Sequence, residues 1–509
     1  MGALLLRADA GSQIGMGHVM RCLALAEPWL QAGSAVTLLT AAPSSALRAR
    51  AESLGVSLSE LTAAPGTPAD AAETIALAQS LCAAWLVLDG YHFDADFQRA
   101  AKAAGLRLLV FDDMGQVAHY SADFILNQNL GAKESLYPHR ERTTRLLLGP
   151  RFVQLRREFP RAAVQTNTAR LPSIAPTGGE GQGEGTSSTR HVLVTLGGSD
   201  PYNVTAHVVA ILQTIPNLTA DIILGPANPH AATLQPAIGN RSSAITVHQN
   251  PADLPHLMSR ADLAICAGGT TAWELSSLGV PMLVLVLAEN QRTNAEQLAV
   301  TGAAIHTAIT SLATDLRALL TNAPLRAKMS ARARMLVDGR GTFRVWLRMN
   351  ETALECRAAH AADCHRVWEW ANEASVRAVS FASEPIPWEQ HQAWFTRKLA
   401  DPSTRLWIVE QDTSPVGQVR FDLDGSIATI SLSLDATRRG KNLGALLIWS
   451  ACQKLFREPA VETVQAFIKL DNAASVRAFE KAGFEPAGQT EVKGCAALRF
   501  EFRRSAAEA

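Results

Sequence analysis

The feature that constrains the fold most is a short apolar run, followed by a glycine-containing turn and then by a helical pattern. Residues 3–6 are long enough for a buried strand, the turn is Gly15-Met16-Gly17-His18, and apolar positions recur at helical spacing over residues 19–27. This order predicts the first βα unit of a doubly wound domain, in which ligands bind at the carboxyl edge of the sheet. Gly15 and Gly17 would let the backbone approach a ligand, and the helix start would offer free N–H groups to an anion.

His18 would project from the start of this helix into the cleft. The positive end of the helix disfavours an imidazolium, so we expect a neutral ring that can act as a general base over a phosphorylated substrate. The alternative is a tight turn beside a histidine whose hydrogen bonds are already satisfied. The rest of the chain favours the functional interpretation.

The alternation of strand-like and helical stretches continues along two long segments, which predicts parallel sheets with helices on both faces. Between them, residues 161–190 are rich in glycine, serine and proline and predict a flexible connector. The predicted fold class is α/β, with two doubly wound, Rossmann-like domains at residues 1–160 and 191–350. The runs interpreted as strands are residues 35–39, 85–88, 106–111 and 145–148 in the first domain and residues 191–196, 221–224, 263–266 and 282–286 in the second.

Two predicted strands of the first domain end in polar clusters. Asp89 opens the cluster at residues 89–94, and Asp112-Asp113 follows the strand at residues 106–111. A carboxylate at the end of a strand either caps the next helix or lies in the ligand cleft. The sequence leaves both possibilities open.

The second domain repeats the transition from glycine to helix. Gly268-Gly269-Thr270 follows a predicted strand, and its N–H and hydroxyl groups suit a diphosphate at a helix N-terminus. Glu274, one turn later, can accept hydrogen bonds from a ribose diol, as an acid does in dinucleotide domains. The alternative is a solvated helix glutamate. Asn290 and Gln291, after the next predicted strand, offer amides that fit sugar hydroxyls.

Composition narrows the class of protein. Lys plus Arg and Asp plus Glu both number 47, so the overall charge steers the chain toward neither nucleic acid nor an anionic membrane. The longest apolar run, residues 280–288, is far short of a membrane span, and Arg7 and Asp9 interrupt the layout of a signal peptide. The seven cysteines lack metal-ligand spacing, so we expect reduced core thiols, no structural zinc and a cytoplasmic protein.

Residues 351–509 follow a different pattern and predict a third domain. A helical region rich in tryptophan precedes strand-like runs at residues 406–409, 416–421 and 427–434, the last two joined by the turn 422–425. A basic loop then opens a helix predicted at residues 446–456. Basic side chains and loop N–H groups at a helix start form a pyrophosphate cradle. A solvated turn is the alternative for this loop taken alone.

Several segments of the first two domains resemble the hydrolase of pseudaminic acid biosynthesis, which removes UDP from UDP-2,4-diacetamido-2,4,6-trideoxy-β-L-altropyranose. The resemblance implies the GT-B architecture and an inverting single displacement by water without a metal. It assigns His18 as the base and Tyr91 as a substrate-side residue. The segments are residues 7–22, 148–159, 197–201 and 268–274. The predicted set for the UDP-sugar is Gly15, Gly17, Tyr91, Gly198, Ser199, Gly268, Gly269, Thr270, Glu274, Asn290 and Gln291.

Residues 351–509 resemble the GNAT acetyltransferases, and in particular the subgroup that acetylates the 4-amino group of UDP-linked amino-dideoxy sugars. The resemblance implies acetyl-CoA as co-substrate. Asn442 stands where the family usually has glycine, and asparagine tolerates a left-handed backbone. Phe479 replaces the tyrosine that protonates the leaving thiolate in many members, and a phenyl ring cannot do so. The predicted acetyl-CoA residues are Leu432, Ser433, Leu434, Arg439, Gly440, Lys441, Asn442, Leu443, Gly444, Asn472 and Ser475.

The leading hypothesis is a bifunctional enzyme of pseudaminic acid biosynthesis, with N-acetylation of a UDP-amino-sugar followed by hydrolytic removal of UDP. A GT-B glycosyltransferase with an accessory acetyltransferase is the second hypothesis, because fold alone does not separate it from a hydrolase. A sugar-nucleotide sensor that binds without turnover is the third.

Overall fold

The computed structural model describes residues 2–11, 15–160, 162–163, 190–198, 200–225, 228–238, 244–251 and 253–504. They form two compact units, one of residues 2–30 and 34–342 and the other of residues 31–33 and 343 onward. Of the predicted connector, only residues 162, 163 and 190 are among the described residues, and Ser199 also lies outside them.

The first sheet is parallel, with strand order β3-β2-β1-β4-β5-β6-β7. The chain runs outward from β1 in one direction and resumes at β4 in the other, so the topological switch point lies between β1 and β4. Ligands of open α/β sheets bind at this point. The strands are β1 (Ala3–Ala8), β2 (Val36–Thr40), β3 (Ser57–Glu60), β4 (Ala83–Asp89), β5 (Leu108–Phe111), β6 (Phe124–Asn127) and β7 (Arg145–Leu148).

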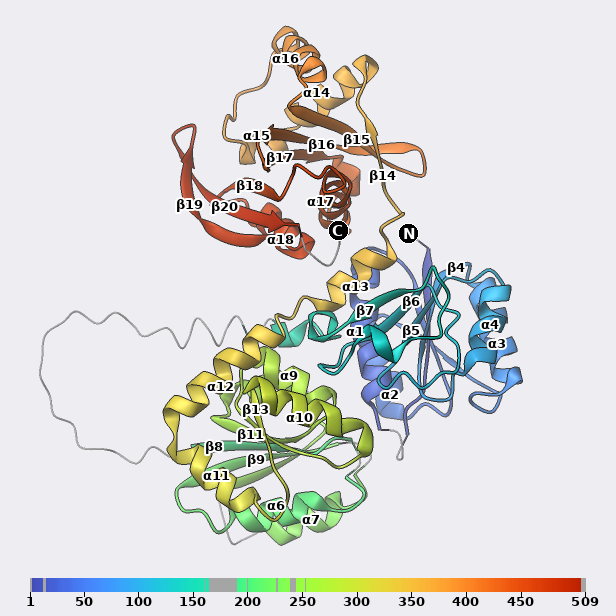
Figure 1. Cartoon of the computed structure of the whole chain (residues 1–509), viewed down its shortest axis with the longest axis vertical. Helices are drawn as coiled ribbons and strands as arrows, with labels where there is room; N and C mark the ends of the chain where they lie inside the picture. Colours follow the sequence, from blue (N-terminus) through green and yellow to red (C-terminus); the bar gives the residue numbers. More distant parts are fainter. Residues whose placement is uncertain are drawn as a thin grey trace, which may run out of the picture. The chain divides into compact units, whose positions relative to one another are not determined.

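Helices cover both faces of this sheet, with α1 and α2 on one side and α3 and α4 on the other (Figure 1). Strands covered on both faces become continuously apolar, which explains why Leu4, Leu5 and Leu6 are all buried. Helix starts follow local capping rules, since Thr67 caps α3 and Asp94 caps α4. The helices are α1 (Gly17–Gln31), α2 (Ser45–Leu54), α3 (Pro68–Ser80) and α4 (Ala95–Ala103), with short 3₁₀ turns η1 (Glu134–Leu136) and η2 (Pro150–Phe152).

The second sheet of the same unit is also parallel, with order β10-β9-β8-β11-β12-β13 and a switch point between β8 and β11. Side chains alternate between two apolar layers, with Leu193 on one face and Val192 and Val194 on the other. Its strands are β8 (Arg190–Thr195), β9 (Leu218–Leu224), β10 (Ile245–Gln249), β11 (Leu263–Ala267), β12 (Met282–Leu285) and β13 (Ala304–His306). Its helices are α6 (Val204–Leu212), α7 (Ala231–Ile238), α8 (Leu254–Arg260), α9 (Thr270–Leu278), η3 (Glu289–Gln291), α10 (Arg292–Thr301), α11 (Leu312–Thr321) and α12 (Ala323–Leu336).

After the second sheet, residues 341–342 pack against residues 153–155, which follow the last strand of the first sheet. The Leu155 N–H donates to Thr342 Oγ1 at 3.0 Å, and the Thr342 hydroxyl donates to the Leu155 carbonyl at 3.1 Å. Gly341 packs so closely there that a Cβ atom would lie 2.3 Å from the Val153 carbonyl oxygen. The helix that begins at this glycine is α13 (Gly341–Met349).

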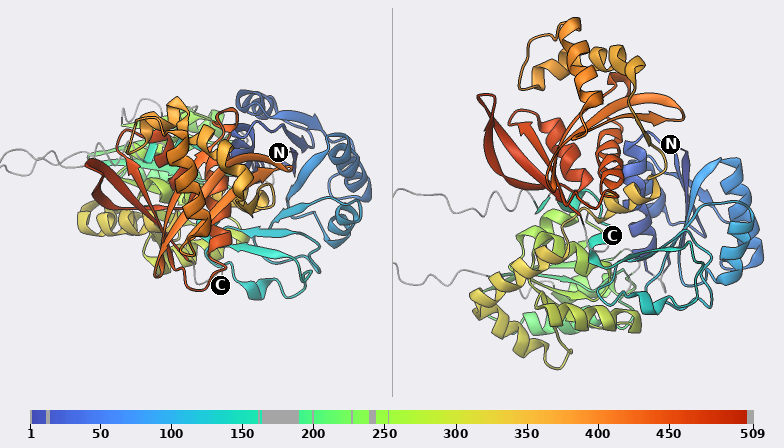
Figure 2. Two further views of the ribbon diagram at one scale, coloured as in Figure 1. Left: turned by 90° about the horizontal axis from the view of Figure 1, so that it is seen from above. Right: turned by 45° about the horizontal axis from the view of Figure 1, so that its top comes forward.

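The C-terminal unit has one mixed sheet, with order β14-β15-β16-β17-β18-β20-β19. Helices α14 and α16 pack on one face through Val367, Phe395 and Ile408, and Figures 1 and 2 show α17 and α18 on the other. The strands are β14 (Glu355–Ala358), β15 (Thr404–Gln411), β16 (Ser414–Asp424), β17 (Ile427–Leu434), β18 (Thr463–Lys469), β19 (Glu485–Val492) and β20 (Cys495–Arg503). The helices are η4 (Ala361–Asp363), α14 (Cys364–Asn372), α15 (Ala374–Val379), α16 (Trp388–Ala400), η5 (Ala436–Arg438), α17 (Leu443–Leu455) and α18 (Ala473–Ala482).

The predicted fold class is confirmed, since two parallel α/β sheets precede a third, mixed α/β unit. Within the described ranges, no helix is both long enough and apolar enough to cross a membrane. The prediction of core cysteines holds for five of the seven free thiols but is wrong for Cys82, which is exposed, whereas Cys495 is half-buried. Cys82 lies in the turn before β4, where the backbone adopts a positive φ and the side chain leaves the core.

We expect Gly341→Ala to lower the melting temperature of the unit that contains both parallel sheets by several degrees, because the new methyl group collides with backbone rather than with a movable side chain. Gly444→Ala, near the start of α17, is the matched control, since its nearest neighbours would be 3.9 Å away. Calorimetry on the full chain measures both. Equal melting curves for the two variants would contradict the assigned packing.

Candidate functional site

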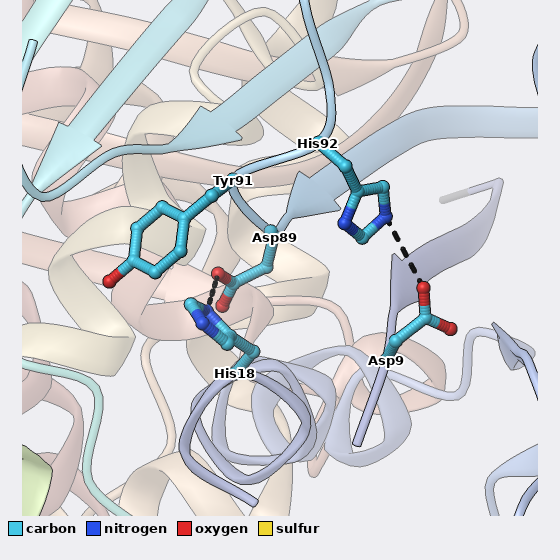
Figure 3. A pocket seen from close by; sticks show the side chains of 6 residues that line it. Asp9, His18, Asp89, Tyr91 and His92 are labelled. Atoms are coloured by element: carbon cyan, nitrogen blue, oxygen red, sulfur yellow. Dashed lines mark hydrogen bonds and ion pairs between the residues drawn. The ribbon is translucent and has the colours of Figure 1, made fainter. Parts of the chain in front are cut away.

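A pocket of about 260 Å³ lies at the switch point of the first sheet (Figure 3). Its walls come from the end of β1, from the start of α1 that follows it, and from the end of β4, which is 71 positions after His18 at Asp89. The lining residues are Asp9, His18, Asp89, Gly90, Tyr91 and His92.

His18 and Asp89 form a hydrogen-bonded pair in this pocket. His18 Nδ1 lies 2.6 Å from Asp89 Oδ1, and the carboxyl group is fully buried. A carboxylate only accepts, so Nδ1 carries the proton, and a neutral ring keeps its lone pair on Nε2. This arrangement orients an imidazole for proton abstraction. The possibility that Asp89 lies in the cleft is therefore the correct one, whereas Asp94 in the same cluster is a helix cap.

Arg21, one turn after His18 on α1, holds two carboxylates at once. Its Nε and Nη2 donate to Asp89 at 2.6 and 2.7 Å, and its Nη1 and Nη2 donate to Asp113 at 2.9 and 3.1 Å. All three side chains are almost completely buried. The planar guanidinium thus fixes the ends of β4 and β5 relative to the start of α1.

The charges of this cluster shift the titration of its members. Burial by itself raises the pKa of Asp89, but Arg21 and His18 outweigh that effect and lower it. Burial likewise opposes ionisation of Asp113, yet Arg21 lowers its pKa to about 2. Burial and the nearby Asp113 carboxylate raise the pKa of Tyr91 to about 12. Both carboxylates are therefore charged and the phenol is neutral at neutral pH.

Residues of the two sheets meet at the edge of the pocket. The Tyr91 hydroxyl donates to Asp113 at 3.1 Å and accepts from Asn290 Nδ2 at 3.0 Å. Asn129 donates to Asp113 at 2.9 Å and accepts from Asn294 at 2.8 Å. Two chains of hydrogen bonds therefore connect the second sheet to the ion-pair cluster of the first.

The glycine-rich turns predicted to bind phosphate also come together. A Cβ on Gly17 would lie 3.8 Å from Thr270 Oγ1, and one on Gly198 would lie 3.8 Å from the Cα of Gly15. Gly269 precedes the first turn of α9, whose leading N–H groups have no partner within the helix. The structure thus brings most of the predicted UDP-binding turns to one place.

Two predicted side chains, those of Glu274 and Gln291, are engaged in other ways. Glu274 is ion-paired with Arg156 at 3.1 Å, and burial raises the pKa of this glutamate although Arg156 opposes the shift. Gln291 Oε1 accepts from the Leu287 N–H, and Gln291 packs where a side chain on Gly268 would stand. Their roles toward a nucleotide stay predictions, as do those of the other predicted residues.

In the C-terminal unit, the basic loop leads directly into α17. Asn442 caps the helix with φ of 58°, so the expected left-handed backbone is confirmed. The Arg439 guanidinium is held by Glu373 and by the Leu434 carbonyl, whereas Lys441 is exposed. The helix begins three residues before the predicted start, at Leu443.

Strands β17 and β18, beside this loop, separate from each other toward the end of β17. β17 pairs with β18 only over residues 427–429, while its other edge stays paired with β16 as far as Leu434. Residues 432–434 therefore present one backbone edge to the gap between β17 and β18, where the amides of an extended ligand could pair. Leu432, Ser433 and Leu434 are the strand residues predicted to bind acetyl-CoA.

Asn472 and Ser475, two of the residues predicted to bind acetyl-CoA, lie at the start of α18. Asn472 caps α18 by accepting from the Ser475 N–H at 3.1 Å. Phe479 is buried and stacks edge to face on Phe484, with ring centroids 4.9 Å apart. This aromatic packing gives Phe479 a core role.

Sequence reasoning missed Arg21 and the amides of Asn129 and Asn294. Arg21 left a signal, because a charged residue interrupts an otherwise apolar helix three positions after His18. The two asparagines are 165 positions apart and lie in unrelated patterns. Within the described residues, no group of three or more His, Cys, Asp or Glu side chains is placed to hold a metal ion.

Two protein-family models match parts of the chain. Residues 191–336 match the glycosyltransferase family 28 C-terminal domain, and residues 354–485 match the acetyltransferase (GNAT) domain. The chain therefore joins a GT-B glycosyltransferase-like fold to a GNAT acetyltransferase domain.

Individual relatives cover different parts of the chain. The spore coat polysaccharide biosynthesis protein SpsG of Bacillus subtilis is 33% identical over 165 residues, which are 31% of this chain and 48% of that protein. The chain thus spans about half the length of SpsG. The uncharacterized protein MJ1062 of Methanocaldococcus jannaschii is 22% identical over 429 residues, 79% of this chain and 81% of that protein. Aminoglycoside N(6')-acetyltransferase type 1 of Klebsiella pneumoniae is 25% identical over 142 residues, 25% of this chain and 71% of that protein.

Solved structures are more distant. Aminoglycoside acetyltransferase AAC(6')-Ib in complex with coenzyme A is 23% identical, with a TM-score of 0.28, and covers 30% of this chain and 95% of its own. MurG of Acinetobacter baumannii is 17% identical, with a TM-score of 0.48, and covers 69% of this chain and 100% of its own. The GNAT match supports acetyl-CoA as the co-substrate of the C-terminal unit.

We expect Asp113→Asn to flatten the acid side of the stability profile. The folded pKa of Asp113 is below that of the unfolded chain, so its stabilisation is complete above about pH 4 and is lost as the pH falls toward 2. The lost contribution is about 2 kcal/mol. Urea unfolding at pH 5, 4 and 3 measures the slope. Asp94→Asn, which removes a charge outside the ion-pair cluster but keeps an oxygen that can cap α4, should leave the slope unchanged. Equal slopes for Asp113→Asn and the unaltered chain would refute the assignment.

Proposed function

We propose that this chain is a bifunctional enzyme of UDP-amino-sugar metabolism. The GNAT domain acetylates the 4-amino group of a UDP-4-amino-4,6-dideoxy sugar. The GT-B-like unit then removes UDP from UDP-2,4-diacetamido-2,4,6-trideoxy-β-L-altropyranose by hydrolysis, as in pseudaminic acid biosynthesis. The observation that carries the hydrolytic half is the 2.6 Å bond between His18 and Asp89 in a pocket beside the glycine-rich turns.

In the proposed hydrolysis, water attacks the anomeric carbon while the bond to the UDP oxygen breaks, so the configuration inverts. His18 Nε2 takes a proton from the water, and the Nδ1–H bond to Asp89 stabilises the imidazolium that forms. Arg21 keeps the Asp89 carboxylate charged and in place. These residues need no covalent intermediate.

The leaving diphosphate gains negative charge during this step. The N-terminus of α9 at Thr270 and the backbone at Gly198 are positioned to receive it, and both lie against the turn that carries His18. Fixed N–H dipoles stabilise developing charge without reorganisation. Glu274 would have to exchange its Arg156 partner for ribose hydroxyls in order to bind the nucleoside.

Glycosyl transfer is the second candidate, because residues 191–336 match a glycosyltransferase family. The same base would then deprotonate an acceptor hydroxyl instead of water. The two functions differ only in what the pocket admits.

We expect the purified chain to release UDP from the diacetamido sugar nucleotide without any added acceptor, with one oxygen from labelled water at C1. His18→Ala should lower the turnover number by about a hundredfold or more, because it removes the base. Asp89→Asn should also slow turnover, since the amide no longer stabilises an imidazolium. Coupled UDP release and mass spectrometry follow the reaction.

The control variant is His119→Ala, an exposed histidine paired with Glu141 outside the pocket. Release of UDP only with an acceptor would identify a glycosyltransferase, and binding without turnover would identify a sensor. Either result would exclude hydrolysis.

For the acetyltransferase, we expect Asn442→Val to raise the KM for acetyl-CoA about tenfold, because a β-branched residue resists the left-handed backbone at the start of α17. Asn442→Gly keeps this conformation and should stay within a few-fold of the unaltered chain. Acetylation of the UDP-4-amino sugar is measured by thiol release. A similar KM for both variants would contradict a role for this backbone in the cofactor loop.

A further inference from the structure

The pocket that holds His18 and Asp89 contains a second histidine and carboxylate, His92 and Asp9 (Figure 3). His92 follows β4, and Asp9 follows β1, so this pair lies at the same switch point of the sheet. The proposed hydrolytic step does not use it.

Asp9 has one satisfied oxygen and one unsatisfied oxygen. Its Oδ1 accepts from Arg7 Nη1 and from the Ala41 N–H, both at 2.7 Å. Its Oδ2 lies 3.3 Å from His92 Nε2, but neither atom has a hydrogen bond of acceptable geometry within the described chain. Asp9 is only 6% exposed, so this oxygen is withheld from bulk solvent. Buried polar atoms without partners are costly in native proteins and call for an explanation.

The position of Asp9 is rigidly fixed from behind. Arg7 is fully buried and donates to Asp70 through both Nε and Nη2, at 3.0 and 2.8 Å. Burial opposes ionisation of Asp9, but His92 and Arg7 outweigh it and hold the pKa of the carboxyl well below its usual value. Asp9 is therefore an anionic acceptor that cannot turn away from the pocket.

His92 is held just as closely. A Cβ on Gly66 or Gly90 would lie 2.9 Å from an atom of His92, so both glycines leave room for its side chain. The neighbouring Phe93 ring has its centroid 4.1 Å from that of His92. Because Nε2 faces a carboxylate, it is the nitrogen that carries a proton.

We propose that Asp9 and His92 form a subsite for a single hydroxyl group of the sugar. One hydroxyl oxygen can donate to Asp9 Oδ2 and accept from His92 Nε2–H, which would satisfy both atoms. A trans amide cannot do the same with one atom, because its N–H and C=O point in opposite directions. The inference rests on the proposed function, whose 2,4-diacetamido-2,4,6-trideoxy substrate has one free ring hydroxyl, at C3.

The test measures binding separately from turnover. In the His18→Ala background of the full chain, calorimetry compares the dissociation constants of UDP, of the diacetamido sugar nucleotide and of its 3-deoxy analogue. His92→Phe removes the donor and should weaken binding of the sugar nucleotide about tenfold, while UDP affinity changes less than twofold. His92→Gln retains a donor and should recover most of the loss. His119→Phe is the control outside the pocket, and thermal unfolding verifies that each variant is folded.

The 3-deoxy analogue completes a double cycle. It should bind about tenfold more weakly than the substrate to the parent protein and equally weakly to His92→Phe, because the same contact is lost only once. Additive losses, equal weakening of UDP, or no effect of His92→Phe would overturn the subsite. Failure of the unaltered chain to release UDP would instead overturn the hydrolase proposal, because the binding cycle does not depend on turnover.

Discussion

The ion pairs of the buried Arg21 guanidinium are the interactions on which the first sheet and its helices depend. The guanidinium reaches from α1 to carboxylates at the ends of two neighbouring strands, and one of these carboxylates orients His18. Breaking a buried ion pair leaves an uncompensated charge, which costs far more than the pair contributes when intact. Arg21, which lies between Asp89 and Asp113, therefore keeps both carboxylates ionised in the interior, and His18 adds to the effect. The orientation of the His18 ring follows from that arrangement.

The ion-pair cluster and the topological switch point lie at the same edge of the first sheet. The switch points of both parallel sheets place loops, and not strand interiors, against one another, so polar groups gather where helices do not cover them. Amide side chains on the second sheet then reach the ion-pair cluster of the first through Tyr91 and Asn129. A change in the spacing of the two sheets would be felt at Asp113, which Arg21 links to Asp89 and so to His18. In the proposed hydrolysis, this network would couple nucleotide binding at the second sheet to the alignment of His18.

Much of the fold could be predicted because apolar runs report burial directly. The strand expected at residues 427–434 has those bounds in β17, and the hairpin before it is present. The turn predicted at residues 422–425 is wrong, because residues 422–424 continue β16 and the turn lies at Gly425 and Ser426. β3 was missed because Ser57–Glu60 is a partly exposed edge strand, and β13 because it has three residues. For the site, local spacing predicted His18 and the glycine turns. It did not decide whether Asp89 caps a helix or lies in the cleft. The partners of Asp89 and Asp113 depend on which strands become neighbours, and no local pattern encodes that order.

The close packing of Gly341 and Thr342 against residues 153–155 closes the two-sheet unit into a ring of covalent and noncovalent connections. Backbone contacts at this crossing therefore hold the segment that leaves the first sheet against the start of α13. These contacts do not depend on how many residues connect position 163 to position 190. Changes in the length or composition of that connection would therefore leave this crossing in place.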